Sequence, residues 1–111
     1  MAKKRDPFVD HVLDLLQPFG AVSARAMFGG YGLYREGVMF ALIADSVLYV
    51  KADDENRGNF EAEGLEKFSY TKQGKTFAMS YYTVPEAAMD DSEALARWAE
   101  EGLAAARRAK G

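Results

Sequence analysis

Few side chains in this 111-residue chain suit acid–base chemistry near neutral pH, because His11 is the only histidine and cysteine is absent. An imidazole titrates in this range without perturbation, and Asp10 or Asp14 could orient it as a general base. The spacing assigns no nucleophile to His11, which lies on the polar side of an expected helix beside Asp14. We therefore interpret His11 as an exposed helix residue, and we expect no catalytic residues and no enzymatic activity.

The metal sites open to this chain are limited by the same composition. Without cysteine, disulfides, thiolate zinc sites and iron–sulfur clusters are excluded. Two acidic sets, at residues 53–55 and 90–93, offer the oxygen ligands that Mg²⁺ and Ca²⁺ prefer. Both sets precede expected helices, where carboxylates accept hydrogen bonds from backbone amides. This position favours helix capping, and we expect neither a metal nor a cofactor.

Two glycine-containing segments resemble nucleotide-binding loops in part. Gly74-Lys75-Thr76 matches the end of a phosphate-binding loop, but that motif needs a glycine where this chain has Ser69, and a strand follows instead of a helix. The segment 29–32, Gly-Gly-Tyr-Gly, is likewise followed by strand-like residues. We interpret 72–75 as a hairpin turn, and 28–32 as a turn or bulge whose glycines allow a close approach of neighbouring atoms.

Basic residues gather at the two ends of a chain whose net charge is −3. Neutralising phosphates supplies most of the affinity of a nucleic-acid-binding protein, so these ends are the candidate nucleic-acid contacts. The alternative, which we favour, is that they are solubilising tails, because acidic blocks at 53–63 and 86–101 lie between them. The basic residues in question are Lys3, Lys4, Arg5, Arg107, Arg108 and Lys110.

The periodicity of apolar residues predicts helices packed on an antiparallel sheet. A helix begins at Asp6-Pro7 and continues to Phe19, and a later helix begins at Asp91 or Ser92. A short helix after Asp53 or Asp54 ends near Gly64. Strands are expected at 22–28, 31–36, 38–44, 46–52, 67–71 and 76–84, with turns at Gly29-Gly30, Glu36-Gly37 and Asp45-Ser46. The prediction is therefore a two-layer α+β domain with a largely antiparallel sheet and three main helices.

We expect a single domain over residues 1–111, with flexible ends at 1–5 and 108–111, because no repeat or linker divides the chain. The longest apolar run, Val38–Ala44, is too short to cross a bilayer, which takes about 20 residues. The charged start is followed by no apolar signal segment. These features predict a soluble cytoplasmic protein.

The strands contain more apolar residues than one buried face requires. Residues 38–43, 47–50 and 77–79 are apolar at successive positions, although neighbouring residues of a strand point to opposite faces. A homodimer interface or a partner-binding surface would cover the second face, and the alternative is that the helices divide between the faces. Six tyrosines with Lys51, Lys67, Lys72 and Lys75 nearby could also stack on single-stranded bases, but we favour sheet packing or a protein interface.

A family resemblance is carried by several phrases of the sequence. These are Arg25-Ala-Met-Phe-Gly-Gly-Tyr-Gly-Leu-Tyr, Gly37-Val-Met-Phe-Ala-Leu-Ile-Ala, Leu48-Tyr-Val-Lys, and Met79-Ser-Tyr-Tyr followed by Pro85. Together with Asn56, Phe60 and Gly74-Lys75, they resemble the N-terminal domain of the TfoX/Sxy competence regulators, from the first helix to about Ala105. The full-length regulators continue into a C-terminal helical domain, whereas this chain ends at Gly111 and looks like a stand-alone short member.

The resemblance implies a bacterial cytoplasmic protein with a fold similar to the type III secretion chaperones. It also implies a role in expression of DNA-uptake genes, as a co-activator beside a transcription factor of the cyclic-AMP receptor protein type. We expect a non-enzymatic, dimeric module that acts through protein contacts. The two alternatives are direct nucleic-acid binding and a small enzyme or ligand-binding domain with a pocket between the sheet and the helices. The predicted partner-binding residues are Met27, Phe28, Tyr31, Tyr34, Tyr81 and Tyr82, and Phe28→Ala and Tyr82→Ala are expected to abolish partner capture without unfolding.

Overall fold

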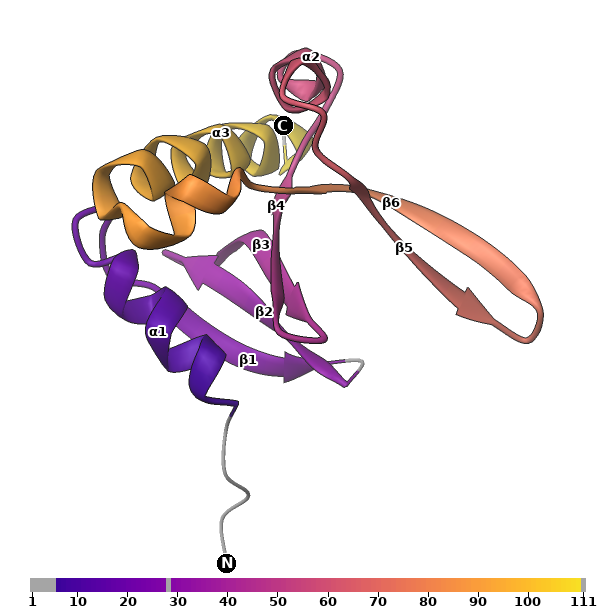
Figure 1. Cartoon of the computed structure of the whole chain (residues 1–111), viewed down its shortest axis with the longest axis horizontal. Coiled ribbons are helices and arrows are strands. Elements are labelled where there is room, and N and C mark those ends of the chain that lie inside the picture. The colour runs from indigo at the N-terminus through magenta and orange to yellow at the C-terminus, as the bar shows by residue number, and fades with distance from the viewer. Residues whose placement is uncertain (1–5, 28, 111) are drawn as a thin grey trace, which may run out of the picture.

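The computed structural model describes residues 6–27 and 29–110 and forms helices packed on one antiparallel sheet (Figure 1). The helical elements are α1 (Pro7–Leu15), α2 (Arg57–Ala62), the 3₁₀ helix η1 (Glu86–Asp90) and α3 (Ser92–Lys110). The strands are β1 (Ser23–Met27), β2 (Gly30–Arg35), β3 (Val38–Ala44), β4 (Val47–Lys51), β5 (Lys67–Lys72) and β6 (Lys75–Thr83). The six strands lie in the order β1-β2-β3-β4-β6-β5, so the predicted α+β class is confirmed.

Helix α1 begins as predicted and ends earlier than predicted. The Asp6 carboxylate accepts a 3.0 Å hydrogen bond from the amide of Phe8, and Pro7 occupies the first turn. The helix ends at Leu15, four residues before the expected Phe19, because Pro18 disfavours helical backbone at the residue before it. Leu16 and Phe19 are nevertheless buried, so this turn still contributes to the core.

Three tight hairpin turns connect neighbouring strands where the sequence predicted them. Both residues have positive φ in each pair: Glu36-Gly37, Asp45-Ser46 and Gln73-Gly74. Positive φ at both central residues is what two-residue hairpins need to match the twist of their strands. The Gly74-Lys75 phrase therefore lies at a strand-to-strand turn, and the phosphate-loop interpretation is excluded because no helix begins there.

The helices all contribute to a single core on one face of the sheet. Val12 of α1 and Leu103 of α3 belong to the same buried cluster as Leu33 and Val50 of the sheet. Phe60 of α2 belongs to this cluster too, and its ring centroid lies 5.0 Å from that of Trp98. The alternative that helices divide between the two faces is therefore wrong, and the second face of the sheet is left without helices among the described residues.

Helix α3 lies unusually close to the sheet at Gly102. A Cβ atom at this position would lie 2.7 Å from the backbone oxygen of Phe40 and would also overlap the side chain of Val50. Glycine is required here by space, since real Cβ atoms do not approach a backbone oxygen this closely. The contact holds the longest helix against β3 and β4, where it covers the centre of the sheet.

A bulge in β3 explains part of the apolar run that the sequence left ambiguous. Leu33 pairs with Ala41 and Tyr34 pairs with Met39, so Phe40 is an extra residue between them. Because a bulge shifts the alternation by one residue, Phe40 and Ala41 are both buried in the core. Met39 and Leu42 are thereby placed on the opposite face of the sheet, away from the helices.

Candidate functional site: an apolar groove on the open face of the sheet

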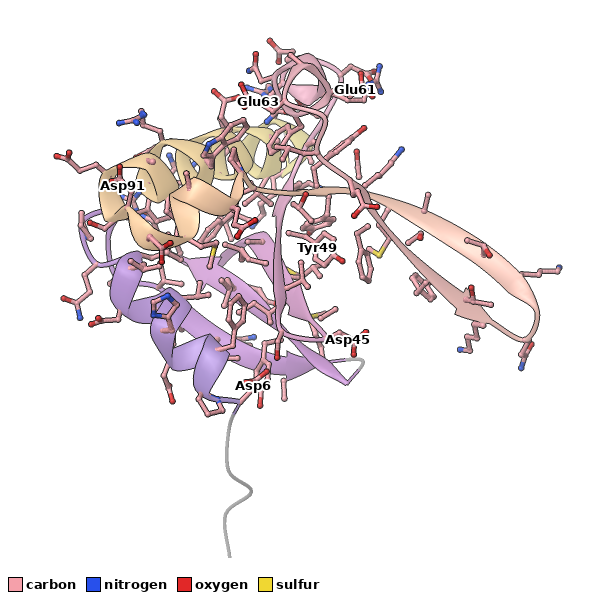
Figure 2. All side chains as sticks on the ribbon, in the orientation of Figure 1. Asp6, Asp45, Tyr49, Glu61, Glu63 and Asp91 are labelled. Atoms are coloured by element: carbon pink, nitrogen blue, oxygen red, sulfur yellow. The ribbon has the colours of Figure 1, made fainter. Side chains whose placement is uncertain are left out.

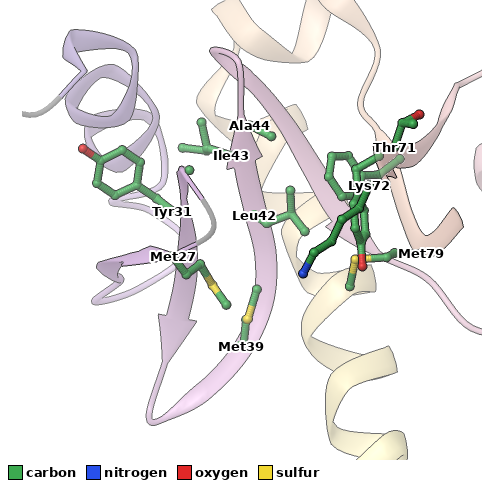
Figure 3. Close-up of a pocket in the computed structure, with 12 residues that line it drawn as sticks. Met27, Tyr31, Met39, Leu42, Ile43, Ala44, Thr71, Lys72 and Met79 are labelled. Carbon is green, nitrogen blue, oxygen red and sulfur yellow. The ribbon is translucent and has the colours of Figure 1, made fainter. Parts of the chain in front are cut away.

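The face of the sheet opposite the helices contains a groove of about 460 Å³. One wall comes from β1, β2 and β3, and the other comes from the protruding β5–β6 hairpin (Figure 3). No helix of the described chain contributes to its lining. We call this site the open-face groove, and its lining residues are Met27, Gly30, Tyr31, Met39, Leu42, Ile43, Ala44, Phe68, Tyr70, Thr71, Lys72 and Met79.

Gly32 allows the floor of the groove to pack closely. A Cβ atom on Gly32 would lie 2.7 Å from the sulfur of Met27 and 3.1 Å from Met39 Cε and from Tyr34 Cε1. Any larger residue would therefore displace these side chains from over β2. The predicted close approach at the glycine-rich phrase is confirmed here, and at Gly30, whose Cβ would overlap the backbone oxygen of Ile43.

The hairpin wall leaves apolar surface exposed. Tyr49 of β4 is labelled in Figure 2. Phe68 packs edge-on against it with ring centroids 4.8 Å apart, and this contact joins the base of the hairpin to β4. Farther along the hairpin, Tyr70 is 43% exposed and Met79 is 37% exposed. Large apolar side chains that line a groove and remain exposed are typical of interaction surfaces.

Cations border this apolar surface. The Arg25 guanidinium lies 4.9 Å from the ring centroid of Tyr34, and the Lys51 ammonium lies 5.1 Å from that of Tyr81. Burial raises the pKa of Tyr81 above its ordinary value, so its phenol is neutral beneath the lysine. Lys72 and Lys75 lie opposite each other at the end of the hairpin.

The structure brings some of the predicted partner-binding residues together and separates others. Met27 lines the open-face groove, and Tyr34 packs beside it over Gly32. Tyr31 lies at the edge of the groove, but it pairs with the core residue Ile43 and its side chain packs against the core on the helix side, so its ring points away from Met27 (Figure 3). Tyr81 lies on the same face but is only 6% exposed. Phe28 lies outside the described residues, so its place is not assigned.

The expectation that Tyr82 belongs to an exposed surface is wrong. Its side chain is 3% exposed and its ring stacks on Phe60 at 5.3 Å, on the helix side of the sheet. Its hydroxyl donates a 3.1 Å hydrogen bond to Glu61, and burial followed by this bond raises the pKa of Tyr82. Tyr81 and Tyr82 are neighbours on one strand and point to opposite faces, so one surface cannot contain both.

The basic residues at the C-terminal end are engaged within the chain. Arg108 donates two hydrogen bonds to the Asp53 carboxylate, at 2.6 and 2.9 Å, and lies 2.7 Å from Glu55. Arg107 lies 3.5 Å from Glu36. Lys110 is exposed, and Lys3, Lys4 and Arg5 lie outside the described residues. A nucleic acid would have to displace both arginines from carboxylates, which weighs against the direct-binding alternative.

The Arg108–Asp53 pair predicts a pH-dependent contribution to stability. The bidentate hydrogen bonds from Arg108 lower the pKa of Asp53 from 3.8 to about 2. Because the pKa of Asp53 is lower in the folded protein than in the unfolded chain, the ion pair stabilises the fold at pH values above the ordinary pKa of 3.8. This contribution is lost as the pH falls toward 2. We expect Arg108→Gln to lower the melting temperature by a few degrees at pH 7 and to have little effect near pH 2.

Melting curves measured from pH 7 to pH 2 test this expectation, with Lys110→Gln as the matched control on the same helix end. Lys110 makes no ion pair within the described chain, so its variant should follow the wild type at every pH. A loss in Arg108→Gln that is equally large at both ends of the range would contradict the proposed linkage.

The other candidate sites have structural roles. The nitrogen Nε2 of the exposed His11 lies 3.3 Å from the backbone oxygen of Met89. Asp91 accepts hydrogen bonds from the amides of Glu93 and Ala94 at 3.1 and 3.2 Å, so the predicted capping is confirmed at α3. Asp53 accepts hydrogen bonds from the amides of Glu55 and Asn56 in the turn before α2. Helix α2 begins at Arg57, three residues later than an Asp53 cap would place it and two residues later than an Asp54 cap would.

Comparison with known proteins agrees with these features. Residues 14–106 match the family model described as the TfoX N-terminal domain. The chain is 34% identical over 77 residues to DNA transformation protein TfoX1 of Aliivibrio fischeri, covering 69% of this chain and 37% of that protein. It is 27% identical over 97 residues to Protein Sxy of Escherichia coli, covering 87% of this chain and 46% of that protein.

A third relative is DNA transformation protein TfoX of Haemophilus influenzae, which is 34% identical over 80 residues, covering 70% of this chain and 37% of that protein. The chain thus spans less than half the length of these curated relatives. No described helix is both long and apolar enough to cross a membrane. Since the family model covers most of the sequence, the chain belongs to the TfoX N-terminal domain family.

Proposed function

We propose that this protein is a non-enzymatic regulator of DNA-uptake genes that acts in the bacterial cytoplasm through contacts with another protein. Two relatives carry the name DNA transformation protein, which supports the connection with DNA uptake. The partner suggested by the family resemblance is a transcription factor of the cyclic-AMP receptor protein type. The observation that carries the mechanism is the open-face groove, an apolar surface that the helices leave uncovered.

The geometry of the groove favours binding over catalysis. Its lining is dominated by methionine, aromatic and aliphatic side chains, with Lys72 as the charged residue. A catalytic site would need a nucleophile, a base and a group that stabilises developing charge, all converging on one point. The lining of the groove contains no carboxylate or histidine that could serve as the base. Its residues therefore support recognition of an apolar surface.

A substitution at the rim of the groove tests this proposal. Met79→Asp places a carboxylate in the contact surface, while Val47→Asp introduces the same charge at an equally exposed strand position outside the groove lining. In a strain lacking the chromosomal gene, we expect Met79→Asp to reduce expression from a DNA-uptake promoter by about tenfold. Val47→Asp should restore expression like the wild-type protein, and melting curves of both variants establish that each is folded.

Two outcomes would contradict the proposal. If deletion of the gene leaves expression of DNA-uptake genes unchanged, the regulatory role is wrong. If folded Met79→Asp restores expression as fully as the wild type, the role stands and the groove is not the contact surface.

A further inference from the structure

The charged residues around the open-face groove are mostly of one sign. Arg25 pairs with Gly32, Lys51 pairs with Tyr81, and Lys72 lies in the groove lining. None of these three, nor Lys75, forms an ion pair within the described parts of the chain. The carboxylates Asp45 and Glu66 lie near Tyr49, but neither lines the groove. In a chain of net charge −3, this face is therefore locally electropositive.

Two of these lysines are placed unfavourably for the free protein. Lys72 and Lys75 are direct partners across the hairpin. Like charges that face each other on adjacent strands destabilise the pair. A bound anion beside the hairpin would offset this repulsion, since the described groove lining contains no carboxylate that could pair with these lysines.

The apolar part of the site is adaptable. Three of the five methionines of the chain, Met27, Met39 and Met79, line the groove. Methionine side chains are unbranched and polarisable, and they repack around different apolar partners. Surfaces of this type accept the apolar face of an amphipathic helix, which inserts residues at positions i, i+3, i+4 and i+7.

We propose that the open-face groove binds an acidic amphipathic helix of a partner protein, an inference that rests on the proposed function in protein contacts. The apolar side chains of the helix lie against Met39, Leu42 and Met79. Its flanking Asp and Glu residues pair with Arg25 on one side and with Lys72 and Lys75 on the other. The charge complementarity selects acidic partners and speeds their encounter with this face.

Two other occupants fit the groove less well. A second copy related by two-fold symmetry would bring the same cations against each other, because a two-fold interface uses the same patch on both subunits. A single-stranded nucleic acid would satisfy the cations, but Arg25 and Lys51 already lie over the rings of Tyr34 and Tyr81, and only Tyr70 among the described tyrosines of the groove has an exposed ring. Stacking of bases on open aromatic rings is the usual source of affinity for single strands.

A displayed library of random 16-residue segments tests the chemistry of the partner without assuming its sequence. The library is selected on the full chain at near-physiological salt, and in parallel on the double variant Lys72→Glu/Lys75→Glu. Lys67→Glu is the matched control, because Lys67 lies on the same strand but pairs with Tyr82 and so belongs to the opposite face. Selected segments are then measured against each protein, with an oligothymidine as competitor.

We expect the full chain to enrich segments with acidic residues and apolar residues at helical spacing. Charge reversal should weaken the binding of these segments by about tenfold and shift the selection toward basic segments, while Lys67→Glu behaves like the wild type. Enrichment of basic or uncharged segments, or enrichment that survives charge reversal, would overturn the inference. So would absence of enrichment, displacement of the segments by oligothymidine, or self-association that is lost in the charge-reversed variant.

The promoter measurement described above separates this inference from the proposed function. If Met79→Asp abolishes promoter activation while the library enriches no acidic segments, the groove contacts a partner of different chemistry. If deletion of the gene has no effect on the promoter while acidic segments are enriched, the groove binds as inferred and the regulatory role is wrong.

Discussion

Gly102→Ala should lower the melting temperature by about 5–15 °C, although alanine is the better helix former. A methyl group at Gly102 would lie 2.7 Å from the backbone oxygen of Phe40, which cannot rotate away as a flexible side chain could. Helix α3 would have to move off the sheet, and overpacking against backbone, which cannot relax as a side chain can, costs up to about 3 kcal/mol. The gain of up to about 1 kcal/mol in helix propensity offsets only part of this cost.

Gly58→Ala is the matched control for this prediction. Gly58 lies in α2, and nothing lies within 4 Å of a Cβ built at that position. The same substitution should therefore be neutral or raise the melting temperature by a few degrees. If both glycine variants shift the melting temperature in the same direction, the close approach of α3 to the sheet does not determine the stability of the fold.

Phe60→Ala should reduce the free energy of unfolding by about 3–5 kcal/mol, which is a large share of the 5–15 kcal/mol typical of a domain. The Phe60 side chain is fully buried, between the rings of Trp98 at 5.0 Å and Tyr82 at 5.3 Å. Its removal leaves a cavity where α2, α3 and β6 meet. Urea denaturation followed by the fluorescence of Trp98, the single tryptophan, measures the loss.

Tyr82→Phe serves as the control because it keeps the stacked ring and removes only the hydroxyl that donates to Glu61. We expect it to cost about 1 kcal/mol or less. An equal loss in both variants would mean that the hydrogen bond, and not the aromatic packing, holds α2 to the sheet. The earlier expectation that Tyr82→Ala leaves the fold intact is replaced by the expectation that it destabilises the core.

The secondary structure could be predicted closely because the turns are marked in the sequence. The pairs Glu36-Gly37, Asp45-Ser46 and Gln73-Gly74 separate apolar runs of strand length, and each adopts the positive φ that a tight hairpin requires. The end of α1 was misplaced because Leu16 and Phe19 continue the helical apolar pattern although the helix has ended. The spacing of these apolar residues therefore indicated that they are buried, and it did not indicate that their backbone is helical.

The site was predicted only in part, for physical reasons that differ between residues. The exclusion of Tyr82 from a surface with Tyr81 follows from strand alternation and was available from the sequence. The bulge at Phe40 could not be predicted from the sequence, because it is defined by the pairing of β2 with β3. The ion pairs of Arg108 could not be predicted either, because Asp53 is 55 residues away along the chain.

The outer part of the β5–β6 hairpin, residues 69–76, contributes to one wall of the groove while adding little to the core. Residues 69–76 are exposed throughout, and β5 is an outermost strand of the sheet. Segments with few buried contacts open locally at a small fraction of the cost of global unfolding. The wall can therefore loosen and reform while the helices and central strands stay folded. A ligand that contacted both walls would slow amide hydrogen exchange in the hairpin before it did so elsewhere. Binding in the groove would therefore be detected as increased local order of the hairpin.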